Sequence, residues 1–366
     1  MRRNEIDWIR NICVLLLFVF HTASIFTYYE PWYIWADDKS WLATIIFIVC
    51  IPWHMPVLFF LAGASTRFSL GSRSEKIYII ERVKKLLIPF ILGMLILVPP
   101  QGYFARVSRG KPVGNYYKQW KYFWTTISDI PYDGGLGPAH LWFILYLFII
   151  SIIGLFIIRS FRKESMKKFL LKLKDIMTSR YSLVFIVFFL FIADMMPLAI
   201  AEKNILIFLI VFLLGYIVYG DKDYLEYIDK NKRKSLILTV IFFIFYISII
   251  LHYYNLGNSD DKGLKVLLSI TRNGAMITNI VTIIGYGTKY LTSRGKVLDY
   301  LSKACFPVYI LHQPVIVIIA YYLLEYSTLP MYFSILIILG SSVPITFGIY
   351  EIFRRIKITK CLIGVK

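Results

Sequence analysis

The feature that most constrains this chain is a succession of long apolar segments that recur from one end of the sequence to the other. A segment of roughly 17–25 apolar residues is long enough to cross a bilayer as an α-helix. Lipid offers no hydrogen-bond partners, and a helix satisfies its own backbone. The sequence therefore predicts about ten transmembrane helices, at Asn11–Tyr28, Trp41–Gly63, Leu86–Tyr103, His140–Ile158, Ser182–Ala201, Asn204–Gly220, Ser235–Tyr254, Leu264–Tyr286, Ala304–Leu324 and Met331–Phe353.

The composition agrees with a membrane-embedded chain. Apolar residues make up 58% of the 366 residues and charged residues 17%, whereas soluble domains carry about 25% charged residues. Aromatic residues reach 17%, and such rings gather at membrane interfaces. We predict an all-α, polytopic integral membrane protein of the cell membrane. It is expected to form a single domain over residues 1–366, with no appended soluble domain.

The net charge of +19 admits two interpretations, nucleic-acid binding or an excess of Lys and Arg in cytoplasmic loops. When the N-terminus is placed in the cytoplasm, the predicted cytoplasmic segments hold 31 Lys and Arg residues and the external segments hold nine. This asymmetry favours the second interpretation. It predicts that both termini are cytoplasmic, that membrane lipid is a partner and that nucleic acid is not.

One histidine lies deep in the first predicted span. His21 follows Arg10 by eleven residues, which is three helical turns plus roughly 20°, so both lie on one face about 16 Å apart. Asp7, three residues before Arg10, joins this stripe and can pair with the arginine. A cation at the mouth can hold donor phosphates, and a neutral imidazole below it can take a proton from a hydroxyl. The alternative is a histidine that only hydrogen-bonds across helices.

Other ionisable or aromatic residues lie at span ends or within spans, where polar groups are costly and are functional candidates. His54 lies between two prolines, His140 and Trp142 open one span, and His312 precedes Pro314. No pair of histidines has the spacing of a metal site, and the four cysteines form no CxxC pair, so no metal is predicted. Asp194 and Arg272 each stand alone in a span, and the sequence does not name their partners.

Two cytoplasmic cations precede the third predicted span. Arg82 and Lys85 are three residues apart, so on an α-helix they would share a face at the membrane surface. Such a pair can grip phosphate or diphosphate. The alternative is a basic cluster that serves topology alone.

The longest external loop is predicted at about residues 101–139. It carries Trp120, Trp124 and Tyr132 among scattered polar groups and a glycine-rich stretch. Loops of this length are often functional. Its rings would suit a sugar acceptor, and resting on the lipid headgroup layer is an equal alternative.

Four patches of the chain carry a shared pattern. They are Asp7-x-x-Arg10 followed by His21, Met55–Gly63, Arg82-x-x-Lys85 before Pro89, and His140–Phe143 together with Tyr309–Pro314. In pattern and order, these patches resemble the membrane-bound acyltransferase family three, in which ten spans are usual. Two further segments, 52–56 and 97–100, resemble its subgroup that succinylates bacterial periplasmic glucans.

The resemblance implies transfer of an acyl group, often acetyl or succinyl, from acyl-CoA to a hydroxyl of a cell-envelope glycan or other carbohydrate. It maps the essential histidine onto His21, the arginine of the first helix onto Arg10, and the basic pair onto Arg82 and Lys85. The family more often has Arg at the second position of that pair, and Lys keeps the charge but loses bidentate geometry. Acyl-CoA is expected as co-substrate, with no permanently bound cofactor.

Two functional hypotheses follow. In the first, His21 deprotonates the acceptor or relays the acyl group, while His54, His140, Trp142 and His312 support the site. In the second, the protein is a transporter or flippase of a lipid-linked or acylated sugar, which also uses broken helices and buried polar groups. The sequence does not determine the oligomeric state.

Overall fold

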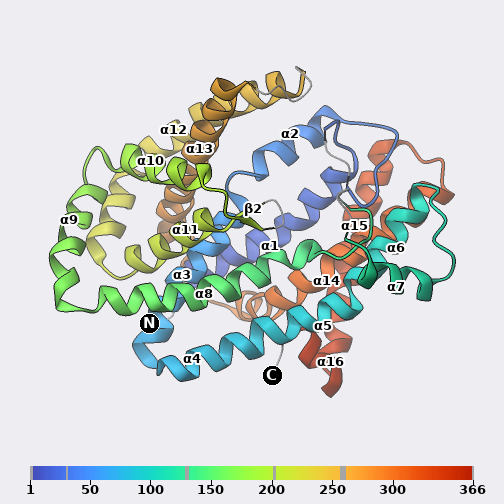
Figure 1. Cartoon of the computed structure of the whole chain (residues 1–366), viewed down its shortest axis with the longest axis horizontal. Helices are drawn as coiled ribbons and strands as arrows, with labels where there is room; N and C mark the ends of the chain where they lie inside the picture. Colours follow the sequence, from blue (N-terminus) through green and yellow to red (C-terminus); the bar gives the residue numbers. More distant parts are fainter. Residues whose placement is uncertain (1–2, 30–31, 128–131, 201–202, 256–260, 365–366) are drawn as a thin grey trace. The chain divides into compact units, whose positions relative to one another are not determined.

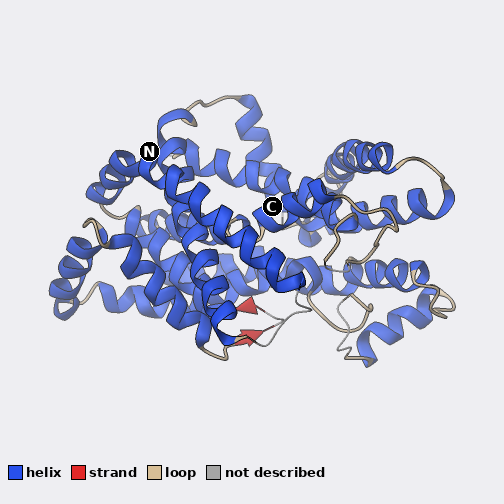
Figure 2. Cartoon of the chain, turned by 90° about the horizontal axis from the view of Figure 1, so that it is seen from above, coloured by secondary structure: helices blue, strands red, loops and turns tan. Residues whose placement is uncertain are grey.

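A computed structural model describes residues 3–29, 32–127, 132–200, 203–255 and 261–364. Across these residues the regular structure is helical, apart from one pair of two-residue strands (Figure 2). The predicted all-α class is confirmed.

The elements follow the chain as labelled in Figure 1. The α-helices are α1 (Asn4–Ile25), α2 (Trp41–Cys50), α3 (His54–Ser72), α4 (Glu75–Arg82), α5 (Ile88–Ile96), α6 (Val98–Ser108), α7 (Tyr116–Thr125), α8 (Trp142–Phe161), α9 (Lys167–Met177), α10 (Ser182–Met195), α11 (Ile205–Val218), α12 (Lys222–Asn255), α13 (Lys262–Tyr290), α14 (Lys296–Tyr326), α15 (Met331–Phe353) and α16 (Lys357–Leu362). A π-helix spans Val83–Leu87, and 3₁₀ helices span Ala139–Leu141 and Glu164–Met166. The strands β1 (Ala199–Ile200) and β2 (Lys203–Asn204) pair antiparallel.

The long apolar helices match the predicted spans. In the described part of the chain, eight helical segments are long and apolar enough to cross a membrane. A ninth candidate is the segment Glu164–Met177 together with α10, bent by 113° at the break, and α11 is a shorter apolar helix. Each of the ten predicted spans corresponds to one of these segments. The protein is therefore a multi-pass membrane protein.

Two predicted spans are broken rather than continuous. The first breaks between α2 and α3, where Pro52 lies in the connecting turn. The second breaks between α5 and α6 at Leu97, and prolines occupy the first turn of α6. Proline lacks the N–H that a helix interior needs but is accepted in a first turn. The missing N–H of proline therefore favours the end of one helix and is tolerated at the start of the next.

Two predicted boundaries differ from the ends of the helices in the structure. The loop at 101–139 begins later, because α6 continues to Ser108, and α7 lies inside it. Hydropathy marks where apolar residues end, and a helix can continue beyond that point. The fifth span ends at Met195 instead of Ala201, since Pro197 disfavours helical backbone before it. Ala201 itself lies outside the described residues.

The contacts group the chain into two compact units. Unit 1 comprises Met1–Arg10, Ile48–Ile80 and Tyr146–Arg294. Unit 2 comprises Asn11–Phe47, Glu81–Leu145 and Gly295–Lys366. The expectation of a single domain stays a prediction.

In unit 1, α3 and α11 cross at two glycines. A Cβ atom on Gly63 would lie 1.8 Å from the Phe212 carbonyl oxygen, and one on Gly215 would lie 1.9 Å from that of Phe60. Both distances are far inside van der Waals contact. The two helices therefore approach as closely as only glycine permits, as in small-residue contacts between membrane helices.

The two lone charged residues of the spans pair with each other in unit 1. The Arg272 guanidinium of α13 lies 2.5 Å from the Asp194 carboxylate of α10. Ser269, one turn earlier on α13, donates a hydrogen bond to the same carboxylate. This pairing supplies the partners that the sequence did not name, and it offsets the cost of two charges in an apolar helix layer.

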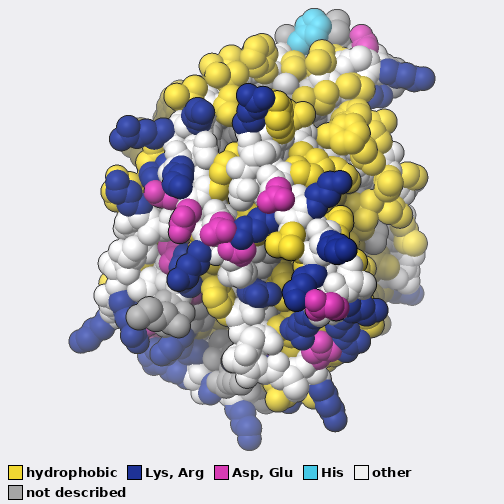
Figure 3. Space-filling view, turned by 90° about the vertical axis from the view of Figure 1, so that its left-hand side faces the viewer, with side chains coloured by type: hydrophobic (Ala, Val, Ile, Leu, Met, Phe, Trp, Pro, Cys, Tyr) yellow, Lys and Arg dark blue, Asp and Glu magenta, His cyan; other side chains and the backbone are white. Residues whose placement is uncertain are grey.

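Charged and apolar side chains separate on the surface of unit 1. α9 carries Lys167, Lys168, Lys172 and Lys174, while α10 and α12 expose Val184, Phe188 and Ile244. Figure 3 faces the side on which α9 lies in Figure 1, and Lys and Arg gather there over the middle and lower parts, with hydrophobic side chains along the top and right. Such a division suits helices in lipid with a basic margin.

Unit 2 is arranged around α14. This helix is the most buried of the long apolar helices, and it packs against α15 and α6. Pro307 and Pro314 lie inside α14. Each removes one backbone donor from the helix, so that a carbonyl one turn earlier becomes available to a side chain.

Candidate active site

Three histidines from distant parts of the sequence meet in unit 2. His21 comes from α1, His140 from the 3₁₀ helix Ala139–Leu141 and His312 from α14, and all three are buried. The His312 ring centroid lies 5.2 Å from that of His21 and 5.5 Å from that of His140. The sequence singled out each of them, and the structure brings them together as one group, here called the imidazole cluster.

Backbone geometry fixes the proton position on His312. Its Nδ1 atom lies 2.6 Å from the carbonyl oxygen of Tyr309, one turn earlier on α14. A carbonyl oxygen only accepts hydrogen bonds, so Nδ1 carries the hydrogen. In a neutral imidazole the hydrogen sits on one nitrogen, which leaves Nε2 of His312 as the basic atom.

His140 is held by a backbone carbonyl that a proline leaves without its helical hydrogen bond. Pro314 has no N–H to donate to the carbonyl of Ile310 four residues earlier. The His140 Nε2 atom donates to that oxygen at 2.9 Å instead, so the basic nitrogen of neutral His140 is Nδ1. The Tyr309 hydroxyl also donates to the His140 carbonyl. α14 therefore sets both the tautomer and the position of His140.

Aromatic rings enclose His21. The Trp32 ring stacks on it with centroids 5.2 Å apart and planes 19° apart, and Phe20 meets its edge at 5.0 Å. Phe18 lies 5.8 Å from His312. Sequence reasoning missed Trp32, which lies outside the predicted spans. The available signal was the density of aromatic residues just after the first span.

A buried amide pair lies beside the cluster. Gln313 follows His312 on α14, and its Nε2 donates to Oε1 of Gln101 on α6 at 2.8 Å. Gln101 in turn donates to the carbonyl of Leu97 at 2.8 Å. Both glutamines are buried. This satisfied polar link fixes α6 against the part of α14 that carries the imidazole cluster.

The predicted stripe on the first helix has the expected form. α1 runs without interruption from Asn4 to Ile25, so Arg10 and His21 lie on one face of it. Arg10 pairs with Asp7 at 3.1 Å, as the spacing predicted. It also donates to the Ser65 hydroxyl at 2.8 Å. Arg10 thus has a fixed position at the start of the helix.

The predicted cation pair lies on an unexpected element. Arg82 ends α4, and Lys85 lies in the π-helix Val83–Leu87. A π-helix has a wider turn than an α-helix, so the argument that spacing of three residues gives one face does not apply here. Such segments are common at functional sites. The pair remains a candidate for donor binding.

Two further predicted supporting residues lie at the first positions of helices. His54 begins α3 in unit 1, and its ring lies 5.7 Å from that of Trp53. Trp142 begins α8, half-buried, with its ring 6.5 Å from that of Phe143. In the described chain, no group of three or more His, Cys, Asp or Glu residues is arranged to hold a metal ion.

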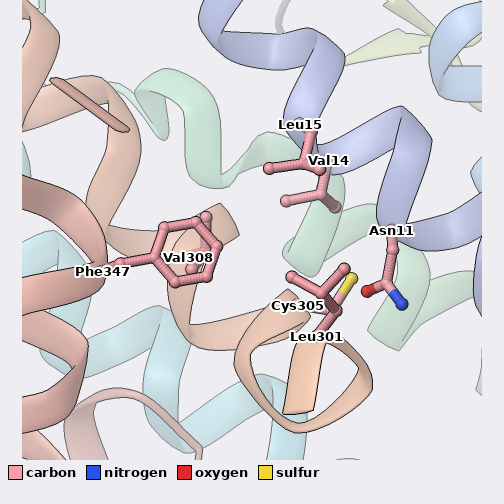
Figure 4. Close-up of a pocket in the computed structure, with 7 residues that line it drawn as sticks. All are labelled: Asn11, Val14, Leu15, Leu301, Cys305, Val308 and Phe347. Atoms are coloured by element: carbon pink, nitrogen blue, oxygen red, sulfur yellow. The ribbon is translucent and has the colours of Figure 1, made fainter. Parts of the chain in front are cut away.

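A small pocket in unit 2 opens between α1, α14 and α15. Figure 4 shows side chains from these helices pointing into it. Its lining is apolar except for Asn11 and Cys305, and Asn11 lies 3.5 Å from the Ser302 hydroxyl. No member of the imidazole cluster lines it. The lining residues are Asn11, Val14, Leu15, Leu301, Cys305, Val308 and Phe347.

The fold and this cluster define a class, a multi-pass membrane protein with oriented imidazoles buried among its helices. Such groups are expensive in a membrane and mark functional sites. The chain belongs to the acyltransferase 3 family, because the model of that family, described as an acyltransferase domain, matches residues 3–351. It is an acyltransferase.

Several similar proteins carry one name. They include the glucans biosynthesis protein C of Salmonella schwarzengrund (strain CVM19633), of Salmonella paratyphi B and of Salmonella agona. Each is 22% identical over 387 residues, which cover 100% of this chain and 95% of the relative. No solved structure matches the chain.

Proposed function

We propose that the protein is an O-acyltransferase of the cell membrane that moves an acetyl or succinyl group from acyl-CoA to a hydroxyl of a cell-envelope glycan or other carbohydrate. The observation that carries this proposal is the imidazole cluster, in which backbone carbonyls assign the basic nitrogens of His140 and His312. The name of the similar proteins, which refers to glucans, supports a carbohydrate acceptor.

His21 is the proposed general base. A neutral imidazole takes the proton of the acceptor hydroxyl while the oxygen attacks the thioester carbonyl. The new C–O bond forms, the C–S bond breaks, and the proton passes from His21 to the leaving CoA sulfur. His312, whose ring lies 5.2 Å from that of His21, positions the base through its own fixed tautomer.

A relay is the variant of the same proposal. His21 would first attack the thioester and carry the acyl group as an acyl-imidazole, and the acceptor would then displace it. The relay suits a donor and an acceptor that reach the histidine from opposite sides of the membrane. It predicts CoA release before any acceptor is added.

The donor is proposed to bind through cations at the cytoplasmic side. Arg82 supplies a positive charge at the end of α4, Lys85 supplies a second within the π-helix, and Arg10 supplies a third on α1. The phosphates of CoA are strong acceptors for such groups. Both chain termini lie in the cytoplasm in this proposal.

Release of free CoA by purified protein tests the proposal. The measured quantity is free thiol formed from acetyl-CoA or succinyl-CoA when a glucan is present. His21→Ala should lower the rate by about 10²–10⁴-fold, the usual contribution of a positioned general base. His252→Ala is the matched control, because His252 is an exposed histidine on α12 in unit 1.

Two results would contradict the proposal. One is an unchanged rate for correctly inserted His21→Ala protein. The other is glucan or sugar movement across a proteoliposome without any thiol release, which would assign the protein to the transporter class.

A further inference from the structure

Three cations at the end of α6 lie near one carboxylate in unit 2, and two of them contact it. Arg106 lies on α6, and Arg109 and Lys111 follow it. Lys111 forms an ion pair with Asp133, and Arg106 lies 3.6 Å from the same carboxylate. Arg106, Arg109 and Lys111 are called here the loop cation cluster.

The cluster carries more positive charge than its own contacts neutralise. Burial raises the pKa of the Asp133 carboxyl, but the hydrogen bonds and charges of Lys111, Tyr122 and Arg106 outweigh burial and lower it overall. Asp133 is therefore a carboxylate at neutral pH. Within the cluster as described, three cations face this single anion, and buried charge without compensation is costly.

Arg106 has the most enclosed charge of the three. Its side chain is only 12% exposed, and its guanidinium stacks 3.8 Å above the ring of Tyr122. Its Nε atom is buried and donates to no acceptor among the described residues. A buried arginine with a spare donor, an adjacent lysine and one carboxylate among the described residues is a typical setting for an anionic ligand.

The cations are not needed to dock the loop. A Cβ atom on Gly102 would lie 2.5 Å from the Gly134 Cα atom, so the glycine-rich turn packs directly on α6. The Gln119 amide also donates to the Gly134 carbonyl at 3.0 Å. Arg109 has a structural role as well, but Arg106 and Lys111 add charge where neutral contacts already hold the turn.

The cluster connects to the imidazole cluster through one residue. Arg109 donates to the Trp32 carbonyl at 2.9 Å and to the Tyr132 carbonyl at 3.1 Å. The Trp32 ring stacks on His21. A ligand group held by the cations would thus lie near the backbone of Trp32, the residue whose ring contacts the proposed base.

We propose that the loop cation cluster binds an anionic group, a phosphate or a carboxylate, of the carbohydrate acceptor. This ligand contact positions the acceptor hydroxyl toward His21. The inference rests on the proposed function for the identity of the ligand as an acceptor, and the binding itself is independent of any transfer step.

Binding of matched sugars to the purified full-length protein tests the inference. Glucose 6-phosphate, inorganic phosphate and glucose are titrated calorimetrically in a neutral detergent without acyl donor. Glucose 6-phosphate should bind at least tenfold more tightly than glucose, and inorganic phosphate should compete with it. Lys111→Gln should weaken glucose 6-phosphate binding by roughly three- to tenfold and leave glucose binding unchanged.

The chain offers matched controls. Lys118→Gln and Lys121→Gln remove exposed cations from α7 of the same loop and should leave glucose 6-phosphate binding unchanged. Arg106→Gln should weaken it more than Lys111→Gln. If Arg106→Gln fails to fold, the binding of glucose 6-phosphate to Lys111→Gln alone tests the inference. The Lys111 side chain is 36% exposed, so its replacement removes little packing.

Distinct outcomes would overturn the inference. Equal affinity for glucose and glucose 6-phosphate excludes an anion site, and equal losses in Lys111→Gln and Lys118→Gln reduce it to general charge attraction. A lipid headgroup would be the ligand if phosphatidylglycerol in nanodiscs, compared with phosphatidylcholine alone, abolishes glucose 6-phosphate binding in the wild type. His21→Ala protein should bind normally, so loss of acyl transfer with intact anion binding would count against the proposed function only.

Discussion

At the scale of single residues, proline determines where a histidine sits. Pro314 leaves the Ile310 carbonyl without its helical donor, and His140 donates to that oxygen across 170 residues of sequence. His312 uses the carbonyl of Tyr309 in the same helix. Two ring nitrogens are thereby held as donors, and the opposite nitrogen of each ring is left as a base.

Replacing Pro314 by alanine should lower the enzymatic activity without lowering the thermal stability of the protein. The new N–H can donate to the Ile310 carbonyl, which takes that acceptor from His140. We expect thermal unfolding to occur at the same or a higher temperature. We expect kcat to fall about fivefold, the effect of losing one hydrogen bond of about 1 kcal/mol, while KM for acyl-CoA stays constant.

The matched control is Pro344→Ala on α15. Pro344 also lies inside a helix of unit 2, and it is exposed. This variant should leave kcat unchanged. A fall in kcat for Pro344→Ala as large as that for Pro314→Ala would contradict the positioning role of the Ile310 carbonyl.

At the scale of elements, the close crossing of α3 and α11 depends on two glycines. In Gly63→Ala the added methyl group would meet the Phe212 carbonyl oxygen at 1.8 Å, so the helices must separate. We expect a loss of stability of about 1–3 kcal/mol, as for other overpacked sites. The measurement is the midpoint of thermal unfolding in detergent.

Gly71→Ala in the same helix is the comparison. A Cβ atom there meets nothing within 4 Å, and alanine favours helix over glycine by up to about 1 kcal/mol. This variant should be as stable as the wild type or more so. If Gly63→Ala and Gly71→Ala behaved alike, the two helices would not be in the close contact described.

The element that carries Lys85 illustrates a limit of periodicity. The sequence Val83–Leu87 contains no proline or glycine and would form a regular α-helix by its local pattern. It forms a π-helix instead. The local cause lies just beyond the segment: Pro89 has no N–H to donate to the Lys85 carbonyl four residues earlier, and the Ile88 N–H donates to the Val83 carbonyl five residues earlier.

At the scale of the whole molecule, the distribution of Lys and Arg predicts which loops face the cytoplasm. Cys361 on α16 is exposed, whereas Cys13, Cys50 and Cys305 are buried. A membrane-impermeant maleimide should therefore label Cys361 only after the cells are permeabilised. In a Cys361→Ser background, Lys118→Cys on α7 should be labelled in intact cells.

The control for this experiment is Lys168→Cys on α9, also in the Cys361→Ser background. Its label should appear only after permeabilisation, like that of Cys361. Labelling of Cys361 and Lys118→Cys under the same condition would place an even number of crossings between them and overturn the predicted topology.

The sequence by itself determined the helical class, the segments that form the long apolar helices and the residues that are candidates for a functional role. Those properties are local, because hydropathy, helical spacing and proline act within a few residues of one another. The sequence placed His21, His140 and His312 in separate predicted spans, and it did not indicate any contact between them.

Only the tertiary structure brought these histidines together and added Trp32 to the group. It likewise paired Asp194 with Arg272, two charges for which the sequence offered no partner. Such contacts join positions separated by tens to hundreds of residues, and they are chosen by how helices pack. A sequence pattern does not specify which helix faces will contact one another.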